Sequence, residues 1–533
     1  MFGLMMHRPL LVSSLIEHAD RHHGDTEIVS READGSIHRS SWGATHQRAR
    51  QLANALLALG VKAGDRIGTL GWNHHRHLEA YYAISGMGAV CHTINPRLFP
   101  DQIAGIIAHA EDGILLVDPM FLPLLESIVS RIGCVRQVIV MGERPGGEAS
   151  AFSLLEYEAL LKAASPRFAW PELDERSAAV LCYTSGTTGK PKGVLYSHRS
   201  TLLHAWAVAL PDSLSFSACD VALPVVPLFH ANAWGFPYAA ALTGAKLVLP
   251  GAQLDGASLY TLLETERVTL TAGVPTVWNH LMQYLQSEGR KLHYLKRLGV
   301  GGAACPKTII SYFEDVQQVT VLPGWGMTET SPVAALARPK ARQAELKGQE
   351  RRNWLARSGR ALFGVDLEIV DEEGRPVAHD GVTFGHLQVK GHWVCSGYYR
   401  EEADPLVNGW FPTGDVAVMD ADGFMQITDR AKDMIKSGGE WISSIELEQV
   451  AASHPAIQEA AVIGMPHPHW GERPFLLVVL RPGEEATPEA LLRYLEQRVA
   501  KWWLPDRIEF VEALPHTATG KLNKAALRSE RGL

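Results

Sequence analysis

The sequence predicts a mixed α/β protein with a large N-terminal α/β domain of several subdomains and a smaller α+β domain at the C-terminus. Three observations lead to this prediction. The chain has 533 residues, more than a single hydrophobic core usually serves. Apolar runs of strand length alternate with helix-length segments past residue 320. A charged, glycine-containing bridge near residue 430 then precedes a segment of domain size, about 100 residues long, with strand-like runs of its own.

The first predicted helix covers residues 41–60 and ends at Gly60, a usual helix stop. Its apolar residues recur at helical spacing: Ala49, Leu52, Leu56 and Leu57. Strand-length apolar runs follow at 67–70, 113–118 and 136–141. Because the segments between these runs are long enough for helices, they predict a mixed α/β sheet.

The second half of the chain adds two further predictions. The charged stretch 338–357 predicts an exposed, helix-rich excursion with a solvated face. The segment after residue 430 predicts strands at 460–465 and 475–480 and an amphipathic helix at 488–500, enough for a small α+β domain. A binding site between the two domains is then expected.

Composition and charge disfavour several classes of protein. A formal net charge of −8 gives no basic field for nucleic acid, so any phosphate must be held locally. The six cysteines form no CxxC pair, which disfavours a disulfide framework and a structural zinc site and fits a reducing cytoplasm. The N-terminus is a poor signal peptide, and no apolar segment approaches the ~20 residues of a membrane-spanning helix. A peripheral membrane contact stays open.

The most informative segment is YTSGTTGKPKG, residues 183–193. Glycines let backbone N–H groups turn toward an anion, hydroxyls add donors, and two lysines supply positive charge, so the segment predicts a phosphate loop. It is not a Walker loop, because Pro191 stands where that motif needs its second glycine. Both flanks, AAVLCY and GVLYSH, read as strands, which predicts a β-hairpin and disfavours a flexible Ser/Thr/Gly linker.

This loop resembles the signature loop of the adenylate-forming superfamily, which includes acyl-CoA ligases, amino-acid adenylation domains and beetle luciferases. Further motifs follow in the family's order: PLFHANAWG at 227–235, GWGMTET at 324–330, GWFPTGD at 409–415, DRAKDMIKSGGEW at 429–441 and PHTATGK at 515–521. The resemblance extends from about residue 40 to the end of the sequence, and is greatest to bacterial medium- and long-chain fatty-acid-CoA ligases and to their relatives acting on 3-methylmercaptopropionate.

The resemblance implies the family's fold, with an adenylate-forming domain at 1–430, a hinge at 431–436 and a mobile lid domain at 437–533. It also implies a nucleotide site between the domains, formed by Thr184, Ser185, Gly186, Thr187, Thr188, Gly189, Lys192, Gly302, Ala303, Gly324, Trp325, Gly326, Met327, Asp415 and Arg430.

Individual roles follow from the same resemblance. Glu329 and Thr184 match ligands of Mg²⁺, which prefers oxygen donors, and Thr328 would contact the α-phosphate. Trp325 would stack on adenine, with its flanking glycines admitting the nucleotide. Asp415 suits the ribose hydroxyls, and Arg430 suits ribose or phosphate. On residue type alone, Trp325 could instead be a core side chain.

Two lysines of the C-terminal segment match functional residues of the family. Lys521 would bridge the substrate carboxylate and phosphate oxygens during adenylation, although a lysine near a terminus is ordinarily a solvated charge. Lys432 resembles the hinge residue about which the lid pivots to a second pose for thioester formation. In that pose coenzyme A would meet Lys436, Ser437, Gly438, Gly439, Glu440 and Trp441.

The acyl site is expected around His230, which is also a candidate catalytic residue. No aspartate stands there to bind a substrate ammonium group, so an amino acid is disfavoured. Trp234, beside Gly235, resembles the gate tryptophan of some fatty-acid ligases, although simple packing would explain it equally well. The small residues Gly301 and Gly302 leave room for a thin apolar chain.

The predicted function is therefore an ATP-dependent acyl-CoA ligase that forms acyl-AMP and then acyl-CoA from a fatty or other short or medium apolar acid, releasing pyrophosphate and AMP. A 3-methylmercaptopropionate ligase and an enzyme that loads a carrier protein are the alternatives. A luciferase-like monooxygenase and an inactive binding protein are weaker ones. The resemblance also suggests a homodimer and a cytoplasmic location, with no nucleic-acid partner.

Overall fold

The computed structural model describes residues 1, 3–143, 150–184, 191–438, 440–517 and 522–533, without the side chain of Glu440. A seven-stranded sheet has the order β7-β6-β5-β3-β4-β8-β9. Its strands are β3 (Arg66–Leu70), β4 (Val90–Thr93), β5 (Ile114–Val117), β6 (Gln137–Val140), β7 (Leu154–Glu156), β8 (Ala178–Tyr183) and β9 (Gly193–Ser197). Neighbouring strands in this sheet are parallel, except β8 and β9, which are antiparallel. The strands predicted at 67–70, 113–118 and 136–141 are confirmed.

A nine-stranded sheet has the order β16-β15-β14-β13-β12-β10-β11-β1-β2. Its strands are β1 (Glu27–Arg31), β2 (Ile37–Ser41), β10 (Val221–Pro224), β11 (Lys246–Leu249), β12 (Leu270–Gly273), β13 (Arg297–Val300), β14 (Thr320–Gly326), β15 (Val333–Leu336) and β16 (Arg360–Ala361). The central strands are parallel. Parallel strands share one carboxyl edge, where ligands usually bind.

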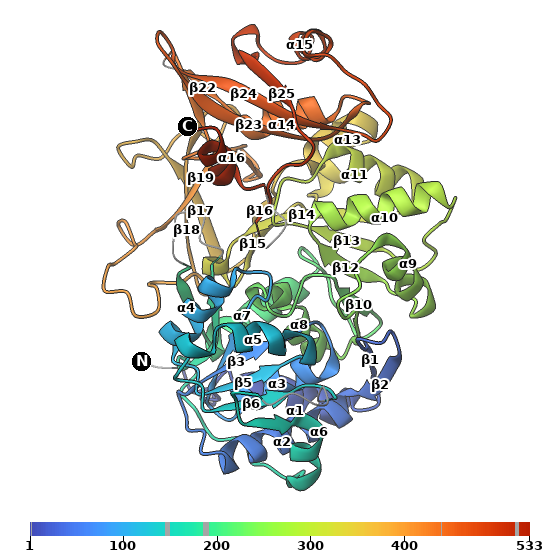
Figure 1. Ribbon diagram of the computed structural model, residues 1–533, viewed down its shortest axis with the longest axis vertical. Coiled ribbons are helices and arrows are strands. Elements are labelled where there is room, and N and C mark those ends of the chain that lie inside the picture. Colours follow the sequence, from blue (N-terminus) through green and yellow to red (C-terminus); the bar gives the residue numbers. More distant parts are fainter. Residues whose placement is uncertain (2, 144–149, 185–190, 439, 518–521) are drawn as a thin grey trace.

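Two antiparallel or mixed sheets complete the chain. One contains β17 (Val365–Val370), β18 (Phe384–Gly391), β19 (Phe411–Met419) and β20 (Met425–Arg430). The other contains β21 (Ile435–Ser437), β22 (Glu440–Ile442), β23 (Ile457–His467), β24 (Gly471–Leu480) and β25 (Arg507–Phe510). In Figure 1 this last sheet, in orange and red, stands at one end of the molecule, over β14, β15 and β16.

The N-terminal helices are α1 (Val12–His23), α2 (Trp42–Ala58), α3 (His75–Gly86), α4 (Pro100–Ala110), α5 (Leu122–Ser127), α6 (Tyr157–Ala163), α7 (His198–Ala209), α8 (Phe236–Thr243), α9 (Gly256–Thr265), α10 (Pro275–Ser287), α11 (Lys307–Ser311), α12 (Ala341–Ala344) and α13 (Gly348–Leu355). α3 lies between the two large sheets, packing on β4 and β8 of one and on β1 of the other. Helices on sheet faces bury the apolar strands, so the predicted mixed α/β class is confirmed.

The C-terminal sheet has its own core. Its helices are α14 (Ser444–Ala452), α15 (Pro488–Glu496) and α16 (Lys524–Glu530). Ile435, Leu447, Val462 and Leu491 join strands and helices in one buried cluster. No helix in the described part of the chain is long and apolar enough to cross a membrane.

Two details differ from the sequence predictions. In α2, Leu57 is 56% exposed, while Leu52 and Leu56 are buried. Position 57 lies just outside the face of the helix that packs on the core. The excursion at 338–357 does contain helices, but Trp354 and Leu355 are buried against the core of the neighbouring sheet. The charged stretch 338–357 is therefore held to the rest of the protein by buried apolar side chains.

Candidate active site

The predicted phosphate loop rises from a β-hairpin. β8 and β9 pair antiparallel, with Tyr183 opposite Gly193, so the predicted hairpin is confirmed. Two hydrogen bonds close its base: the Thr184 N–H donates to the Lys192 carbonyl (2.9 Å), and the Lys192 N–H donates to the Thr184 hydroxyl (3.2 Å). A hairpin offers no helix N-terminus, so phosphates must be held by the loop's own donors. The predicted residues Ser185, Gly186, Thr187, Thr188 and Gly189 lie outside the described residues.

The carboxylate predicted to bind Mg²⁺ is buried in a short 3₁₀ turn, Thr328–Thr330. The Tyr398 hydroxyl donates to Glu329 Oε1 (2.8 Å), and the Tyr196 hydroxyl donates to the Thr328 carbonyl (2.6 Å). Burial raises the pKa of both tyrosines, so both hydroxyls stay protonated and act as donors. Tyr196 and Tyr398 thus fix the turn that carries Thr328 and Glu329.

Tyr398 also connects this turn to the phosphate hairpin. The Lys192 ammonium lies 4.5 Å from the centroid of the Tyr398 ring, a cation–π contact. The candidate metal ligands Thr184 and Glu329 are therefore joined through Lys192 and Tyr398. Among the described residues, no group of three or more His, Cys, Asp or Glu side chains could hold a metal ion. The two oxygen donors fit Mg²⁺, which is usually held by one or two protein carboxylates together with phosphate and water.

The predicted nucleotide residues Trp325, Asp415 and Arg430 meet directly. The Trp325 indole N–H donates to Asp415 Oδ2 (2.9 Å), and Arg430 Nε lies 2.9 Å from Asp415 Oδ1. Asp415 and Arg430 stand opposite each other on β19 and β20, which explains why residues fifteen positions apart form an ion pair. Asp415 is buried and Arg430 is partly exposed. Both oxygens of Asp415 are thus held in fixed orientations by these partners, and binding of the ribose stays a prediction.

The glycines beside Trp325 have a role that the sequence did not show. A Cβ at Gly326 would lie 2.0 Å from the Pro332 carbonyl oxygen, and one at Gly324 would lie 2.9 Å from that of Ala335. These glycines therefore permit the close approach of β15. Stacking of Trp325 on adenine stays a prediction.

The predicted acyl motif forms a left-handed turn. Ala231, Asn232, Ala233 and Trp234 have φ values of 36°, 45°, 49° and 53°, and Gly235 follows at 81°. Left-handed backbone costs a residue with a side chain roughly 1–2 kcal/mol, so four such residues in a row store several kcal/mol of strain. The surrounding structure must offset this strain.

Asn73 holds the strand end that leads into this turn. Its Nδ2 donates to the carbonyls of Pro224 and Val226 (both 2.9 Å), and the Leu228 N–H donates to its Oδ1 (2.7 Å). Asn73 is buried, so these bonds are shielded from water. Neither Asn73 nor its role was found by sequence reasoning.

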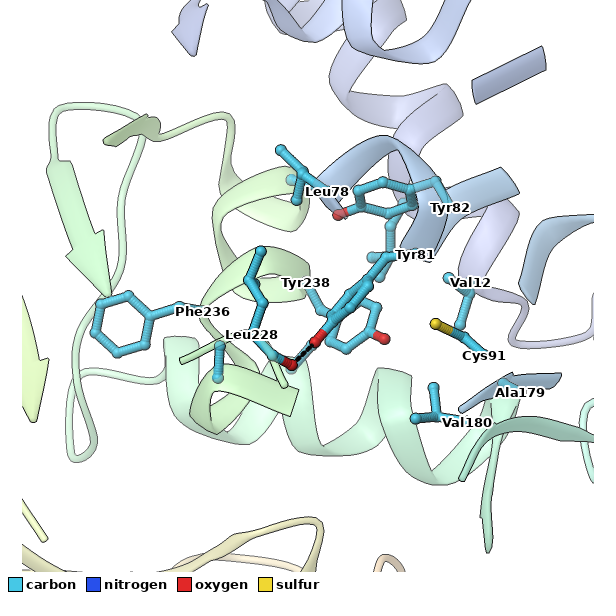
Figure 2. Close-up of a cluster of buried hydrophobic side chains, with 14 of the residues drawn as sticks. Val12, Leu78, Tyr81, Tyr82, Cys91, Ala179, Val180, Leu228, Phe236 and Tyr238 are labelled. Atoms are coloured by element: carbon cyan, nitrogen blue, oxygen red, sulfur yellow. Dashed lines mark hydrogen bonds between the residues drawn. The ribbon is translucent and has the colours of Figure 1, made fainter. Parts of the chain in front are cut away.

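Three buried tyrosines of α3 and α8, namely Tyr81, Tyr82 and Tyr238, lie near Leu228, the residue two positions before His230 (Figure 2). The Tyr81 hydroxyl donates to the Leu228 carbonyl, and the Asn232 side-chain amide donates to the Tyr238 hydroxyl (3.0 Å). Tyr82 donates to the Pro237 carbonyl (2.8 Å). The strained segment is therefore tied down at both ends.

The ring of Trp234, the predicted gate residue, lies against Gly301. A Cβ at Gly301 would lie 2.9 Å from Trp234 Cη2 and 3.5 Å from the Gly324 carbonyl oxygen. Gly301 therefore stands between the left-handed turn and β14, the strand that carries Gly324. Gly302 (φ 78°) and Ala303 continue into the loop after β13. His230 precedes the turn and is partly exposed.

The hairpin β21–β22 carries the residues predicted to meet coenzyme A. The Lys436 ammonium lies 4.1 Å from the centroid of the Trp441 ring and 3.6 Å from Glu372. A Cβ at Gly438 (φ 62°) would lie 2.7 Å from the Trp470 ring, so here this glycine admits a tryptophan. Lys432 is exposed in the turn after β20. Gly439, the Glu440 side chain and Lys521 lie outside the described residues.

Two protein-family models match the chain. Residues 15–399 match the model described as AMP-binding enzyme, and residues 446–521 match the AMP-binding enzyme C-terminal domain. The chain belongs to the AMP-binding enzyme family. The resemblance drawn from the motifs is thereby confirmed.

Relatives of this AMP-binding enzyme carry names of acyl-CoA ligases, the predicted class. A 3-methylmercaptopropionyl-CoA ligase of Ruegeria lacuscaerulensis is 50% identical, with 99% of each chain covered. A medium-chain-fatty-acid–CoA ligase of Ectopseudomonas oleovorans is 48% identical, covering 100% of this chain and 98% of the relative. A long-chain-fatty-acid–CoA ligase of Thermus thermophilus is 49% identical, covering 99% and 96%.

Solved structures agree with the fold of this AMP-binding enzyme. An anthranilate CoA ligase in complex with anthranoyl-AMP has a TM-score of 0.88 at 25% identity, covering 99% of this chain and 98% of that one. An ATP-bound MatB from Rhodopseudomonas palustris has a TM-score of 0.82 at 26% identity, covering 97% and 98%. The predicted fold, with a large N-terminal and a smaller C-terminal domain, is confirmed.

Proposed function

We propose that this chain is an AMP-forming acyl-CoA ligase that uses ATP and takes an apolar carboxylic acid. The observation that carries the proposal is the position of Gly301, which contacts the Trp234 ring of the acyl motif and faces the Gly324 carbonyl of the nucleotide strand. A site with acid on one side and nucleotide on the other suits attack of a carboxylate on ATP.

In the first step a carboxylate oxygen attacks the α-phosphorus, and the bond to the leaving pyrophosphate breaks. The two reactants are anions, so positive charge must stand close to both. Lys192 and Arg430 supply such charge, and Lys521 is the proposed bridge between carboxylate and phosphate. Thr184 and Glu329 would hold Mg²⁺, which supplies charge to the phosphates when bound.

Nucleotide binding falls to the Asp415 cluster. Asp415 is held by Trp325 and Arg430, so its oxygens are oriented before the ribose arrives. Such preorganisation lowers the entropy lost on binding. We assign Asp415 to the ribose hydroxyls, Trp325 to the adenine face and Thr328 to the α-phosphate.

In the second step the sulfur of coenzyme A attacks the acyl carbon, the C–S bond forms and AMP leaves with the bonding electrons, while the thiol proton is released. We propose that the lid turns about the hinge at 431–436 between the two steps. Lys436, Gly438 and Trp441 would then line the path of the thiol. His230 would lie at the acyl carbon.

The substrate class is an apolar acid of short to medium length. The Trp234 ring and Gly301 form an apolar, narrow contact that suits a thin chain. A thioether acid is the second candidate, because the relative at 50% identity is a 3-methylmercaptopropionyl-CoA ligase. A carrier protein as thiol acceptor, a homodimer and a cytoplasmic location stay predictions from the sequence.

The test is CoA-dependent AMP formation with ATP and Mg²⁺ across butyrate, 3-methylmercaptopropionate, octanoate and palmitate. We expect one acid class to be preferred and Lys521→Ala to lose adenylation by about 10²-fold or more, as expected for a group that acts in the transition state. AMP release that does not need CoA would refute the thiol acceptor. No turnover with any acid would refute the enzyme assignment.

A further inference from the structure

A buried polar cluster crosses the hinge between the two domains. On the N-terminal side, Asp429 of β20 is 1% exposed and accepts the backbone N–H (2.6 Å) and hydroxyl (2.5 Å) of Ser444, the first residue of α14. Beside it, the Ser443 hydroxyl donates to the Thr428 carbonyl (2.5 Å). Three hydrogen bonds thus join residues before the hinge to residues after it.

Lys524, the first residue of α16, completes this cluster. Its ammonium donates to the Ser444 hydroxyl (2.5 Å) and lies 2.7 Å from Glu448. Burial opposes a charged lysine, but Glu448 and Asp429 more than offset it and raise the pKa of Lys524, so the group stays charged. A buried ammonium keeps its place only while its partners surround it.

The cluster is tied to one arrangement of the domains. Thr428 and Asp429 belong to the sheet of β19, whereas Ser443, Ser444 and Lys524 belong to the C-terminal unit. Hydrogen bonds weaken steeply beyond about 3.5 Å and away from linear geometry. Rotation about residue 432 would move one set against the other and leave buried charges unpaired.

The arrangement favours the nucleotide step. Asp429 directly precedes Arg430, the ion-pair partner of Asp415, so the cluster lies beside the ribose site. In the same arrangement, the residues proposed to line the thiol path have other partners: Lys436 lies 3.6 Å from Glu372, and Gly438 lies against the Trp470 ring. We therefore assign this arrangement to the adenylation step.

We propose that Asp429, Ser444 and Lys524 form an interdomain latch, which holds the lid in the adenylation pose and must open before coenzyme A reacts. Lys524 is a positioning residue that orients the Ser444 hydroxyl toward Asp429. The proposal rests on the proposed function for its two-step cycle, and it predicts opposite effects on the two steps.

The first experiment separates the half-reactions in Lys524→Met. We expect acid-dependent exchange of pyrophosphate into ATP to fall about 10-fold or more, because Ser444 loses the ammonium group that orients its hydroxyl toward Asp429. Thioester formation from synthetic acyl-AMP and CoA should stay unchanged or rise. Asp429→Asn should give the same split, and the double variant should fall no further than either single one, because both substitutions act through the contact that Ser444 makes with Asp429.

The matched control is Arg531→Met. Arg531 follows α16, and its ion pairs with Glu509 and Glu530 stay within the C-terminal unit. We expect both half-reactions to be affected equally in this variant, if at all. Equal loss of both half-reactions in Lys524→Met, or loss of neither, would overturn the latch.

A second readout does not depend on activity. Limited trypsin digestion at Arg430, Lys432 and Lys436, followed by mass spectrometry, measures how often the hinge opens. Cleavage should be several-fold faster in Lys524→Met than in the wild-type chain and in Arg531→Met, because cleavage follows the open population. Unchanged cleavage would overturn the latch. A wild-type chain without pyrophosphate exchange would refute the proposed function alone, since the digestion still tests the latch.

Discussion

Replacing Asp415 by alanine should abolish recognition of the ribose. Asp415 is buried, with one oxygen on Trp325 and the other on Arg430, each at 2.9 Å. The substitution removes both acceptors from the place where the ribose hydroxyls would donate. We expect kcat/KM for ATP to fall, while the KM for the acid changes little.

The size of this effect follows from the hydrogen bonds involved. A hydrogen bond to a charged group contributes about 1.5–3 kcal/mol. Loss of two ribose bonds would therefore cost about 3–6 kcal/mol, or about 10²–10⁴-fold in kcat/KM for ATP. Asp415→Asn keeps one acceptor oxygen and a similar shape, so its loss should be intermediate.

The decisive assay pairs the variant with altered nucleotides. Wild-type protein should prefer ATP over 2′-deoxy-ATP or 3′-deoxy-ATP by about 10–150-fold, the value of one charge-assisted bond. Asp415→Ala should lose that preference. Pyrophosphate exchange measures both, and circular dichroism checks that the variant is folded. If Asp415→Ala still discriminates against the deoxynucleotides as the wild type does, the ribose assignment is wrong.

Three other substitutions test the remaining contacts. Gly301→Val must displace the Trp234 ring, since even a Cβ would lie 2.9 Å from it. In initial-rate assays, kcat/KM for the acid should fall about 10–100-fold. An equal loss in kcat/KM for ATP would contradict the pocket assignment. Tyr398→Phe loses the 2.8 Å hydrogen bond to Glu329. Calorimetry should show that the Mg²⁺ concentration needed for ATP binding rises about 10-fold. An unchanged Mg²⁺ requirement would argue against a role of Tyr398 in orienting Glu329. Asn73→Ala leaves a buried N–H unpaired and should cost about 2–4 kcal/mol in urea unfolding, whereas a change below about 1 kcal/mol would show that water replaces it.

Sequence reasoning found the residues whose chemistry lies in a local motif. Thr184, Lys192, Glu329 and Asp415 stand in short segments of glycine, hydroxyl and charged residues. The structure joins the first three through Tyr398 and joins Asp415 to Trp325 and Arg430. The strands were also predictable, because short apolar runs bounded by turns signal strands in a parallel sheet.

The supporting residues were not predictable in this way. Tyr398 and Tyr196 are distant in sequence from the turn at Thr328 and Glu329, and nothing in the sequence near either residue indicates which carbonyl or carboxylate it meets. Asn73 lies more than 150 positions from Leu228. Such contacts depend on how the sheets pack, and a single sequence shows no pairing between distant positions. The close approach of Gly324 and Gly326 to the backbone of Ala335 and Pro332 was not predictable for the same reason, and their contact with the nucleotide stays a prediction.

The left-handed turn explains why so many buried groups converge on one short motif. The turn is closed by its own hydrogen bond from the Ala233 N–H to the His230 carbonyl (3.0 Å), but positive φ still costs energy at Ala231 and Trp234. Asn73 and Tyr81 bind the backbone before it, and Tyr238 binds Asn232 within it. Strain persists only where the surroundings over-determine it. Here the constraint holds the Trp234 ring against Gly301, so the position of this ring is set by buried side chains of α3 and α8.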